Sequence, residues 1–253
     1  MLLIVLLILS NWVHGAELFE VLQSDHSYQS YYQFKLTKTK IISLLNWELI
    51  EDQGNAVPPE AYQRNLHFKG WIRDPSHKSC FDVRSLALQR QAEGTIITNP
   101  KNQCMIYKSK WYDPYSNQYF YNASDVDIDH LVPLKNAYYS GAWDWTKAKR
   151  CNFSNFLEDR YHLIVVESSE NRSKGSRGPD KFIPINPQFQ CLYLASWLRV
   201  KAFWNLRIAV GEAQAIHNFL DHRSCPKEYF FITFDEFSKM QSKINAPPKE
   251  CLN

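Results

Sequence analysis

The sequence predicts an α+β fold in which short strands and helices share one substantial domain. Residues 127–132 are rich in apolar and β-branched side chains and stop at Pro133, which is typical of a short strand. A second apolar run at 162–166 predicts another strand, and the next segment, 168–175, begins with helix-entry residues and ends in glycine. Residues 189–206 are strongly apolar and favour a largely buried helix.

Further elements are expected on either side of this centre. Residues 37–51 carry apolar side chains at mixed spacing, which predicts a helix. Residues 111–121 predict a hairpin with its turn at 113–117, because this stretch is rich in Asp, Pro, Ser and Asn. Two more helices are expected at 211–221 and 234–240.

The composition is that of a folded protein. Apolar residues make up 45% of the 253 residues, aromatic residues 15% and charged residues 22%, and this balance excludes a disordered chain. The net charge is only +3. Such a charge fits a nucleic-acid partner without establishing one, since a local basic groove matters more than the total.

The N-terminus predicts a secretion signal. Residues 2–13 are almost wholly apolar and are followed by His14, Gly15 and Ala16, where small residues suit a signal peptidase. This run of about a dozen residues is shorter than the roughly 20 that span a bilayer. We therefore expect a secreted or periplasmic protein with no membrane span in its mature form. A buried N-terminal helix or strand is the alternative.

Four segments are expected along the chain. They are a signal peptide at 1–16, an N-terminal lead-in at 17–59, the main domain at 60–226 and a C-terminal extension at 227–253. The run of prolines at 58–59 marks the start of the main domain.

The chain has six cysteines, an even number, and no Cys-x-x-Cys pair. A zinc ribbon is therefore disfavoured, and disulfides are expected if the protein is exported. The sequence by itself does not choose among the possible pairings.

The two predicted strands and the short helix carry polar residues that could bind a metal ion or accept a proton. Asp129 and Asn171 offer the hard oxygen atoms that Mg²⁺ or Mn²⁺ prefers, and a neutral His130 can take a proton from water. Adjacent residues of a regular strand point to opposite faces. Either the strand therefore ends or bulges here, or a phosphate lies between Asp129 and His130 at the strand edge. Asp127 shares the face of Asp129 and is either a reserve ligand or a residue with a capping or hydrogen-bonding role.

Three ordered pieces resemble the HNH motif of the ββα-metal (His-Me finger) endonucleases. They are Asp-His-Leu-Val-Pro-Leu at 129–134, His-Leu-Ile at 162–164 and Asn-Arg-Ser-Lys-Gly at 171–175. The chain is most similar to the branch typified by the C-terminal nuclease domain of GmrSD-type restriction enzymes, whose relatives include many secreted bacterial proteins. The resemblance spans roughly 62–225, and its flanking features lie at 71–72, 80–84, 111–115, 140–145 and 191–201.

The resemblance implies both a fold and a set of disulfides. The expected fold is a ββα-metal core braced by additional helices and a small β-hairpin, and stabilised by disulfides. The implied disulfide pairs are Cys80 with Cys104, Cys191 with Cys225 and Cys151 with Cys251.

The resemblance also implies a metal-dependent endonuclease. In this reading His130 is the general base, and Asp129 and Asn171 hold a single Mg²⁺, with Mn²⁺ as a substitute. His162 lies where many HNH enzymes have an asparagine that supports or orients the base. A histidine there can orient the base, ligate the metal or be purely structural. Four basic residues are expected to contact the nucleic acid: Arg172, Lys174, Arg150 and Lys149.

The expected substrate is DNA, with RNA as a further substrate. No helix-turn-helix or other sequence-reading element is evident, which favours non-specific cleavage through backbone contacts. Two other functions stay open at this point. One is a non-catalytic protein for nucleic-acid binding or uptake, and the other is an exported effector or toxin.

Overall fold

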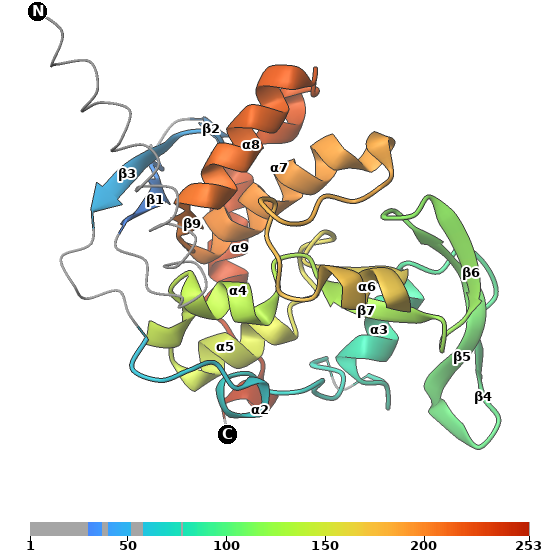
Figure 1. The fold of residues 1–253 in the computed structure, drawn as a ribbon. Helices are drawn as coiled ribbons and strands as arrows, with labels where there is room; N and C mark the ends of the chain where they lie inside the picture. The colour runs from blue at the N-terminus through green and yellow to red at the C-terminus, as the bar shows by residue number, and fades with distance from the viewer. Residues whose placement is uncertain (1–29, 37–39, 52–57, 77, 253) are drawn as a thin grey trace, which may run out of the picture.

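The computed structural model describes residues 30–36, 40–51, 58–76 and 78–252 (Figure 1). The predicted signal peptide at 1–16 lies outside these residues. Among the described helices, none combines the length and the apolar character that crossing a membrane requires. The mixture of helices and strands agrees with the α+β class expected from the sequence.

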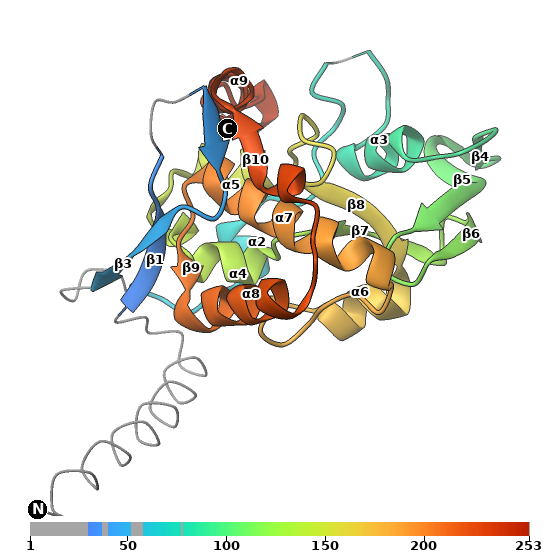
Figure 2. The ribbon, with the colours of Figure 1, turned by 90° about the horizontal axis from the view of Figure 1, so that it is seen from above.

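Two antiparallel strands and a short helix form the centre of the molecule. Strand β7 (Val126–His130) pairs with β8 (Leu163–Glu167) in a regular register that ends with His130 opposite Leu163. Helix α6 (Ser168–Lys174) follows β8 directly and lies beside the pair in both views (Figures 1 and 2). It ends at Gly175, where a φ of 54° suits glycine. The predicted order of strand, excursion, strand and helix is confirmed.

The excursion between these strands is helical. It contains α4 (Leu134–Tyr139), the 3-10 helix η1 (Ala142–Asp144) and α5 (Lys147–Ser154). Thr146 caps α5 by accepting a hydrogen bond from the Lys149 amide. Helix α5 ends beside His130, and the chain then continues to β8.

Long helices brace this centre. Helix α7 (Pro187–Trp204) is largely buried, and α8 (Val210–His222) and α9 (Phe234–Ile244) follow it. The three helices predicted in these regions are confirmed. The remaining short elements are η2 (Lys227–Phe230), β10 (Phe231–Thr233) and η3 (Lys249–Cys251).

The helix predicted over 37–51 is wrong. The described part of this segment contains β2 (Ile41–Ser43) and β3 (Trp47–Glu51) instead. Strand β3 pairs with β1 (Ser30–Phe34), which also pairs with β9 (Ile208–Ala209), while β2 pairs with β10. Pairing with other strands, one of them distant in sequence, overrides the weak local helix pattern.

A three-stranded sheet lies at the other end of the molecule from β1 and β3 (Figures 1 and 2). Its order is β4 (Ile97–Asn99), β5 (Asn102–Asp113) and β6 (Gln118–Asn122). Tyr112 pairs with Tyr119, which confirms the predicted hairpin. Its turn is held by the Asp113 carboxylate, which accepts hydrogen bonds from the Tyr115 and Ser116 amides.

This sheet is packed onto the β7–β8 pair through one face. Trp111 is fully buried against helix α3 (Val83–Arg90), and its indole donates a 2.8 Å hydrogen bond to the Leu88 carbonyl oxygen. Ile106 belongs to the same apolar cluster, together with Ile128 and Val165 of the central pair. The hairpin is therefore rigidly attached to the strands that carry Asp129 and His130.

Three disulfides are present, and they are the pairs that the family resemblance implied. Cys80 is bonded to Cys104, Cys191 to Cys225 and Cys151 to Cys251. The last of these ties η3, near the C-terminus, to α5.

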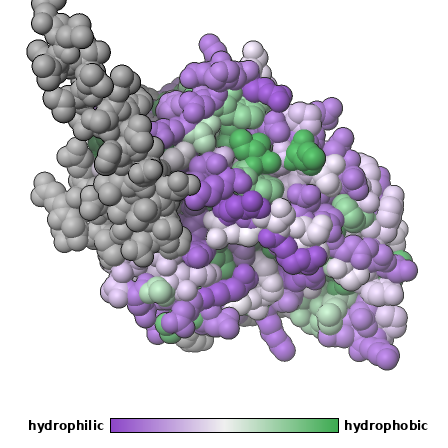
Figure 3. Space-filling model, viewed as in Figure 1, coloured by the Kyte–Doolittle hydropathy of each residue, from purple (hydrophilic) through white to green (hydrophobic). Residues whose placement is uncertain are grey.

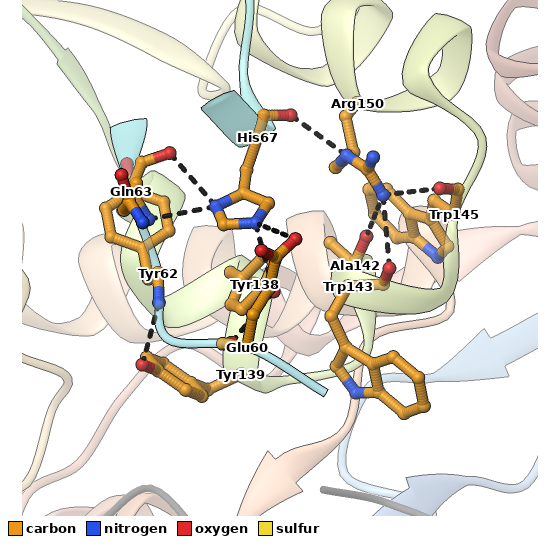
Figure 4. A network of polar contacts seen from close by, with 10 residues as sticks. All are labelled: Glu60, Tyr62, Gln63, His67, Tyr138, Tyr139, Ala142, Trp143, Trp145 and Arg150. Carbon is orange, nitrogen blue, oxygen red and sulfur yellow. Dashed lines mark hydrogen bonds and ion pairs between the residues drawn. The ribbon is translucent and has the colours of Figure 1, made fainter. Parts of the chain in front are cut away.

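A polar network fixes the short helix α2 (Arg64–His67) against α4 and α5 (Figure 4). The Nε2 atom of His67 lies 3.0 Å from a Glu60 carboxylate oxygen and 3.2 Å from the Tyr138 hydroxyl. Arg150 donates to the carbonyl oxygen of His67 at 2.9 Å, and its Nη1 also donates to three carbonyl oxygens of the turn before α5, those of Ala142, Trp143 and Trp145. Arg150 thus joins three segments from inside the fold.

Candidate active site

His130 ends β7 with its ring held on two sides. Its Nε2 atom lies 2.9 Å from the Ser154 carbonyl oxygen, at the end of α5. Because a carbonyl oxygen only accepts hydrogen bonds, Nε2 carries the proton and Nδ1 keeps its lone pair. Within the described residues Nδ1 has no hydrogen-bond partner, and it is not one of the fully buried polar atoms. The ring also stacks on Trp71, with centroids 5.3 Å apart and planes 3° from parallel.

His130 is only 6% exposed, and its burial lowers its pKa to about 3. The hydrogen bond to Ser154 opposes this shift but does not cancel it. The imidazole is therefore neutral at neutral pH, which is the form that can accept a proton.

His162, directly before β8, is a second buried histidine, and it contacts the same end of α5. Its Nε2 lies 2.6 Å from the Phe153 carbonyl oxygen, and the rings of Phe153, Phe156 and Trp204 surround it. Burial lowers its pKa to about 4. Its Nδ1 is buried and has no partner among the described residues.

The two histidines thus bind consecutive carbonyl oxygens of α5, those of Phe153 and Ser154. The last carbonyl oxygens of a helix have no partner within the helix, so they are free to accept these bonds. His162 does not contact a phosphate-accessible surface, since it is 1% exposed. It binds the same helix end that holds His130.

Asp129 points to the opposite side of β7 from His130. The pairing of β7 with β8 contains no bulge, so the two neighbouring side chains lie on opposite faces. The Asp129 carboxylate accepts a 2.7 Å hydrogen bond from the Tyr115 hydroxyl, and the Lys174 ammonium lies 2.9 Å from both of its oxygens. Lys174 also donates to the His130 carbonyl oxygen at 3.0 Å.

The Asp129–Lys174 pair is fully enclosed. Asp129 is 4% exposed and Lys174 is 0% exposed. Burial raises the pKa of Asp129 and lowers that of Lys174, and the opposite charge of each group counteracts the shift in the other. Burial also raises the pKa of Tyr115 well above its usual range, so this hydroxyl stays a donor.

Asn171 lies beside Asp127 and not beside Asp129. Its amide nitrogen donates a 3.1 Å hydrogen bond to an Asp127 carboxylate oxygen, and both side chains are partly exposed. Asp127, Asp129 and Asn171 therefore share the side of β7 that faces α6, while His130 lies on the other side.

The donor chemistry on this side suits a hard divalent cation only in part. Asp127 and the amide oxygen of Asn171 are neighbouring oxygen donors, as Mg²⁺ prefers. The Asp129 carboxylate is already bound by Tyr115 and Lys174. It could therefore bind the same cation as Asp127 and Asn171 only if the Lys174 ammonium moved away. In the described chain no three His, Cys, Asp or Glu side chains form a ready metal-binding group.

Two of the four basic residues expected at the nucleic-acid surface lie inside the protein. Lys174 pairs with Asp129, and Arg150 is 9% exposed and bonds backbone carbonyl oxygens. The expectation that these two residues contact phosphate is wrong, because each cation binds buried acceptor atoms inside the protein. Arg172 is exposed in the last turn of α6. Lys149 is partly exposed, with its ammonium 4.4 Å from the Trp145 ring centroid.

The sequence interpretation missed three contacts of the site. Tyr115 was expected only as a turn residue, Trp71 only as a flanking feature, and Ser154 not at all. Tyr115 and Trp71 did lie within flanks that carried the family resemblance, at 111–115 and 71–72. The role of Ser154 rests on its carbonyl oxygen, which any residue would supply, so no residue type could reveal it.

Comparison with known proteins gives two matches. Residues 82–219 match the family described as the C-terminal domain of GmrSD restriction endonucleases. An uncharacterised secreted protein of Arthroderma benhamiae is 34% identical over 179 residues, which is 71% of this chain and 82% of that protein. No solved structure matches the chain. The family match contains Asp129, His130, His162 and Asn171 but not Trp71.

Proposed function

The chain belongs to the family of the C-terminal domain of GmrSD restriction endonucleases, and on that basis we propose that it is a secreted, metal-dependent endonuclease. Its reaction is hydrolysis of phosphodiester bonds in DNA, with RNA as a further substrate. The observation that carries the proposal is the state of His130. This neutral imidazole donates from Nε2 to the Ser154 carbonyl oxygen and leaves Nδ1 without a partner in the described structure.

His130 acts as the general base. Nδ1 accepts a proton from the attacking water, and the imidazolium that forms is stabilised through its Nε2 proton by the Ser154 carbonyl oxygen. The negative charge of a bound phosphodiester raises the pKa of His130 above about 3, since a nearby opposite charge favours the protonated ring. Stacking on Trp71 keeps the ring plane in place during this transfer.

The proposed reaction would also need a single divalent ion. We assign it to the side of β7 that faces α6, with Asn171 as a ligand and Asp127 beside it, and with Asp129 as a ligand once Lys174 releases it. A bound Mg²⁺ or Mn²⁺ would act as a Lewis acid and stabilise the leaving oxygen. Before a metal binds, the buried ammonium of Lys174 offsets the charge of Asp129 and donates to the His130 carbonyl oxygen.

Nucleic acid is held through its backbone. Arg172 is exposed one residue after Asn171, where its planar guanidinium suits a bidentate phosphate contact. Lys149 lies further away, on α5. Contacts of this kind carry no base information, which fits cleavage without sequence preference.

Cleavage assays with purified, oxidised protein test the proposal. Plasmid DNA and single-stranded RNA are incubated with Mg²⁺, Mn²⁺ or EDTA, for the parent, His130→Ala and the control His222→Ala. His222 is an exposed histidine on α8. Loss of the base should slow cleavage by roughly 10² to 10⁴, while the control matches the parent.

Two outcomes would contradict the proposal. One is equal cleavage by the parent and by a folded His130→Ala variant, which would remove the general base. The other is full cleavage in EDTA, which would remove the metal from the mechanism.

A further inference from the structure

The outer face of the β5–β6 hairpin carries tyrosines that face solvent. Successive residues of a strand alternate between faces, so Lys110 and Tyr112 lie opposite the buried Trp111, and Tyr119 and Tyr121 lie opposite the partly buried Phe120. We call these four side chains, Lys110, Tyr112, Tyr119 and Tyr121, the tyrosine face. Tyr119 is 45% exposed and Tyr121 is 57% exposed.

Direct contacts join Tyr112, Tyr119 and Lys110 of this face. The rings of Tyr112 and Tyr119 are 5.4 Å apart between centroids. The Lys110 ammonium lies 3.9 Å from the Tyr119 ring centroid and 3.3 Å from a Glu93 carboxylate oxygen. The hydrogen bond that Lys110 donates to Glu93 is the main cause of its raised pKa, and the nearby Tyr119 and Tyr121 raise it further. Aromatic rings and a cation are thus interleaved on one face of the sheet.

The sheet concentrates exposed tyrosines. Of the four tyrosines that are well exposed in the described chain, Tyr107, Tyr119 and Tyr121 belong to this sheet, and only Tyr229 lies elsewhere. Lys108 adds a second cation, 5.3 Å from the Tyr107 ring centroid. Figure 3 shows no broad apolar patch on the side of this end that it displays. Ile97 and Met105 of the same sheet are each 50% exposed, so its surface mixes apolar, aromatic and basic side chains.

We propose that the tyrosine face binds a single-stranded segment of nucleic acid, with bases stacked on Tyr119 and Tyr121 and with Lys110 and Lys108 near the backbone. Stacking on aromatic side chains requires unpaired bases, because the bases of a duplex already stack on one another. Lysines between the rings suit phosphates and disfavour an uncharged ligand as the main partner.

The position of the hairpin links this face to the cleavage site. Strand β5 ends at Asp113, and Tyr115, two residues later, donates to the Asp129 carboxylate. Tyr112 is three residues from Tyr115, so their Cα atoms are at most about 10 Å apart. The inference rests on the proposed function for its choice of ligand, and it narrows the substrate to nucleic acid with single-stranded character.

Binding is measured without cleavage, in the full-length His130→Ala protein with EDTA. Fluorescence anisotropy follows a labelled single-stranded DNA of about 15 nucleotides, within the range that such sites cover, and a duplex of the same length. The variants are Tyr119→Ala/Tyr121→Ala, the ring-preserving Tyr119→Phe/Tyr121→Phe, and the control Tyr229→Ala. A soluble neutral oligosaccharide serves as a competitor.

The single strand should bind more tightly than the duplex. The double alanine variant should lose at least about tenfold in affinity for the single strand, while the phenylalanine variant and the control retain it. The proposal fails if the double alanine variant binds as well as its parent, if the parent does not bind the single strand, or if the oligosaccharide displaces it. If the single strand binds but the parent protein cleaves no nucleic acid, only the proposed function is overturned. If the parent cleaves nucleic acid but the single strand does not bind, only the proposal for the tyrosine face is overturned.

Discussion

His162 makes the stability of this protein depend on pH. The folded imidazole has a pKa of about 4, because it is buried, while an unfolded histidine has a pKa of about 6.5. Between these values the unfolded chain binds more protons than the folded one. The contribution of His162 to stability is therefore present above pH 6.5 and is lost as the pH falls toward 4.

The size of the effect follows from that difference. At about 1.4 kcal/mol per pKa unit, the full contribution is about 3 kcal/mol, and about 2 kcal/mol of it is lost between pH 7 and pH 5. Replacing His162 with Asn removes the titrating group. Between pH 7 and pH 5, the parent should lose about 2 kcal/mol more of its free energy of unfolding than the variant does. This difference does not depend on how stable the variant is at pH 7.

Urea unfolding of the oxidised protein at pH 7 and pH 5, followed by tryptophan fluorescence, measures this difference. His222→Asn, which replaces an exposed histidine on α8, is the matched control and should follow the parent. An equal loss of stability between pH 7 and pH 5 in the parent and in His162→Asn would refute the reasoning. His130 is buried with a pKa of about 3 and should leave a similar pH dependence in both proteins.

Two further predictions concern the side of β7 that faces α6. Lys174→Met should destabilise the fold by roughly 3 to 5 kcal/mol, because it leaves the Asp129 carboxylate buried without its cation, and Lys174→Met/Asp129→Asn should recover part of the loss in urea unfolding. A double variant as unstable as the single one would contradict this. Asn171→Ala should raise the Mg²⁺ concentration for half-maximal cleavage by about tenfold or more, whereas superimposable Mg²⁺ titrations would exclude Asn171 as a ligand.

Local signals in the sequence predicted the centre of the molecule well. Pro133 marks the end of the apolar segment that contains β7, and Gly175 marks the end of α6. The continuous apolar sequence of β8 predicts a buried strand. Each of these elements depends on neighbours within a few residues. The same is true of the hairpin turn, where Asp113 binds amides two and three residues away.

Signals without a local basis were interpreted less well. The helix expected at 37–51 is replaced by β2 and β3, whose partners include β10, almost 200 residues later in the chain. Lys174 and Arg150 resemble surface cations in the sequence, yet both are buried because acceptors from other segments surround them.

The sequence by itself determined the order of the strands and the short helix, the family, and which polar residues stand at the tip of β7. Only the tertiary structure decided what each of them contacts. Asp129 meets Tyr115 and Lys174, which are 14 and 45 residues away, and His130 meets a carbonyl oxygen 24 residues away. The physical reason is that strand and helix periods depend on near neighbours, whereas a buried charge or ring takes its partners from whichever segments the folded chain packs around it.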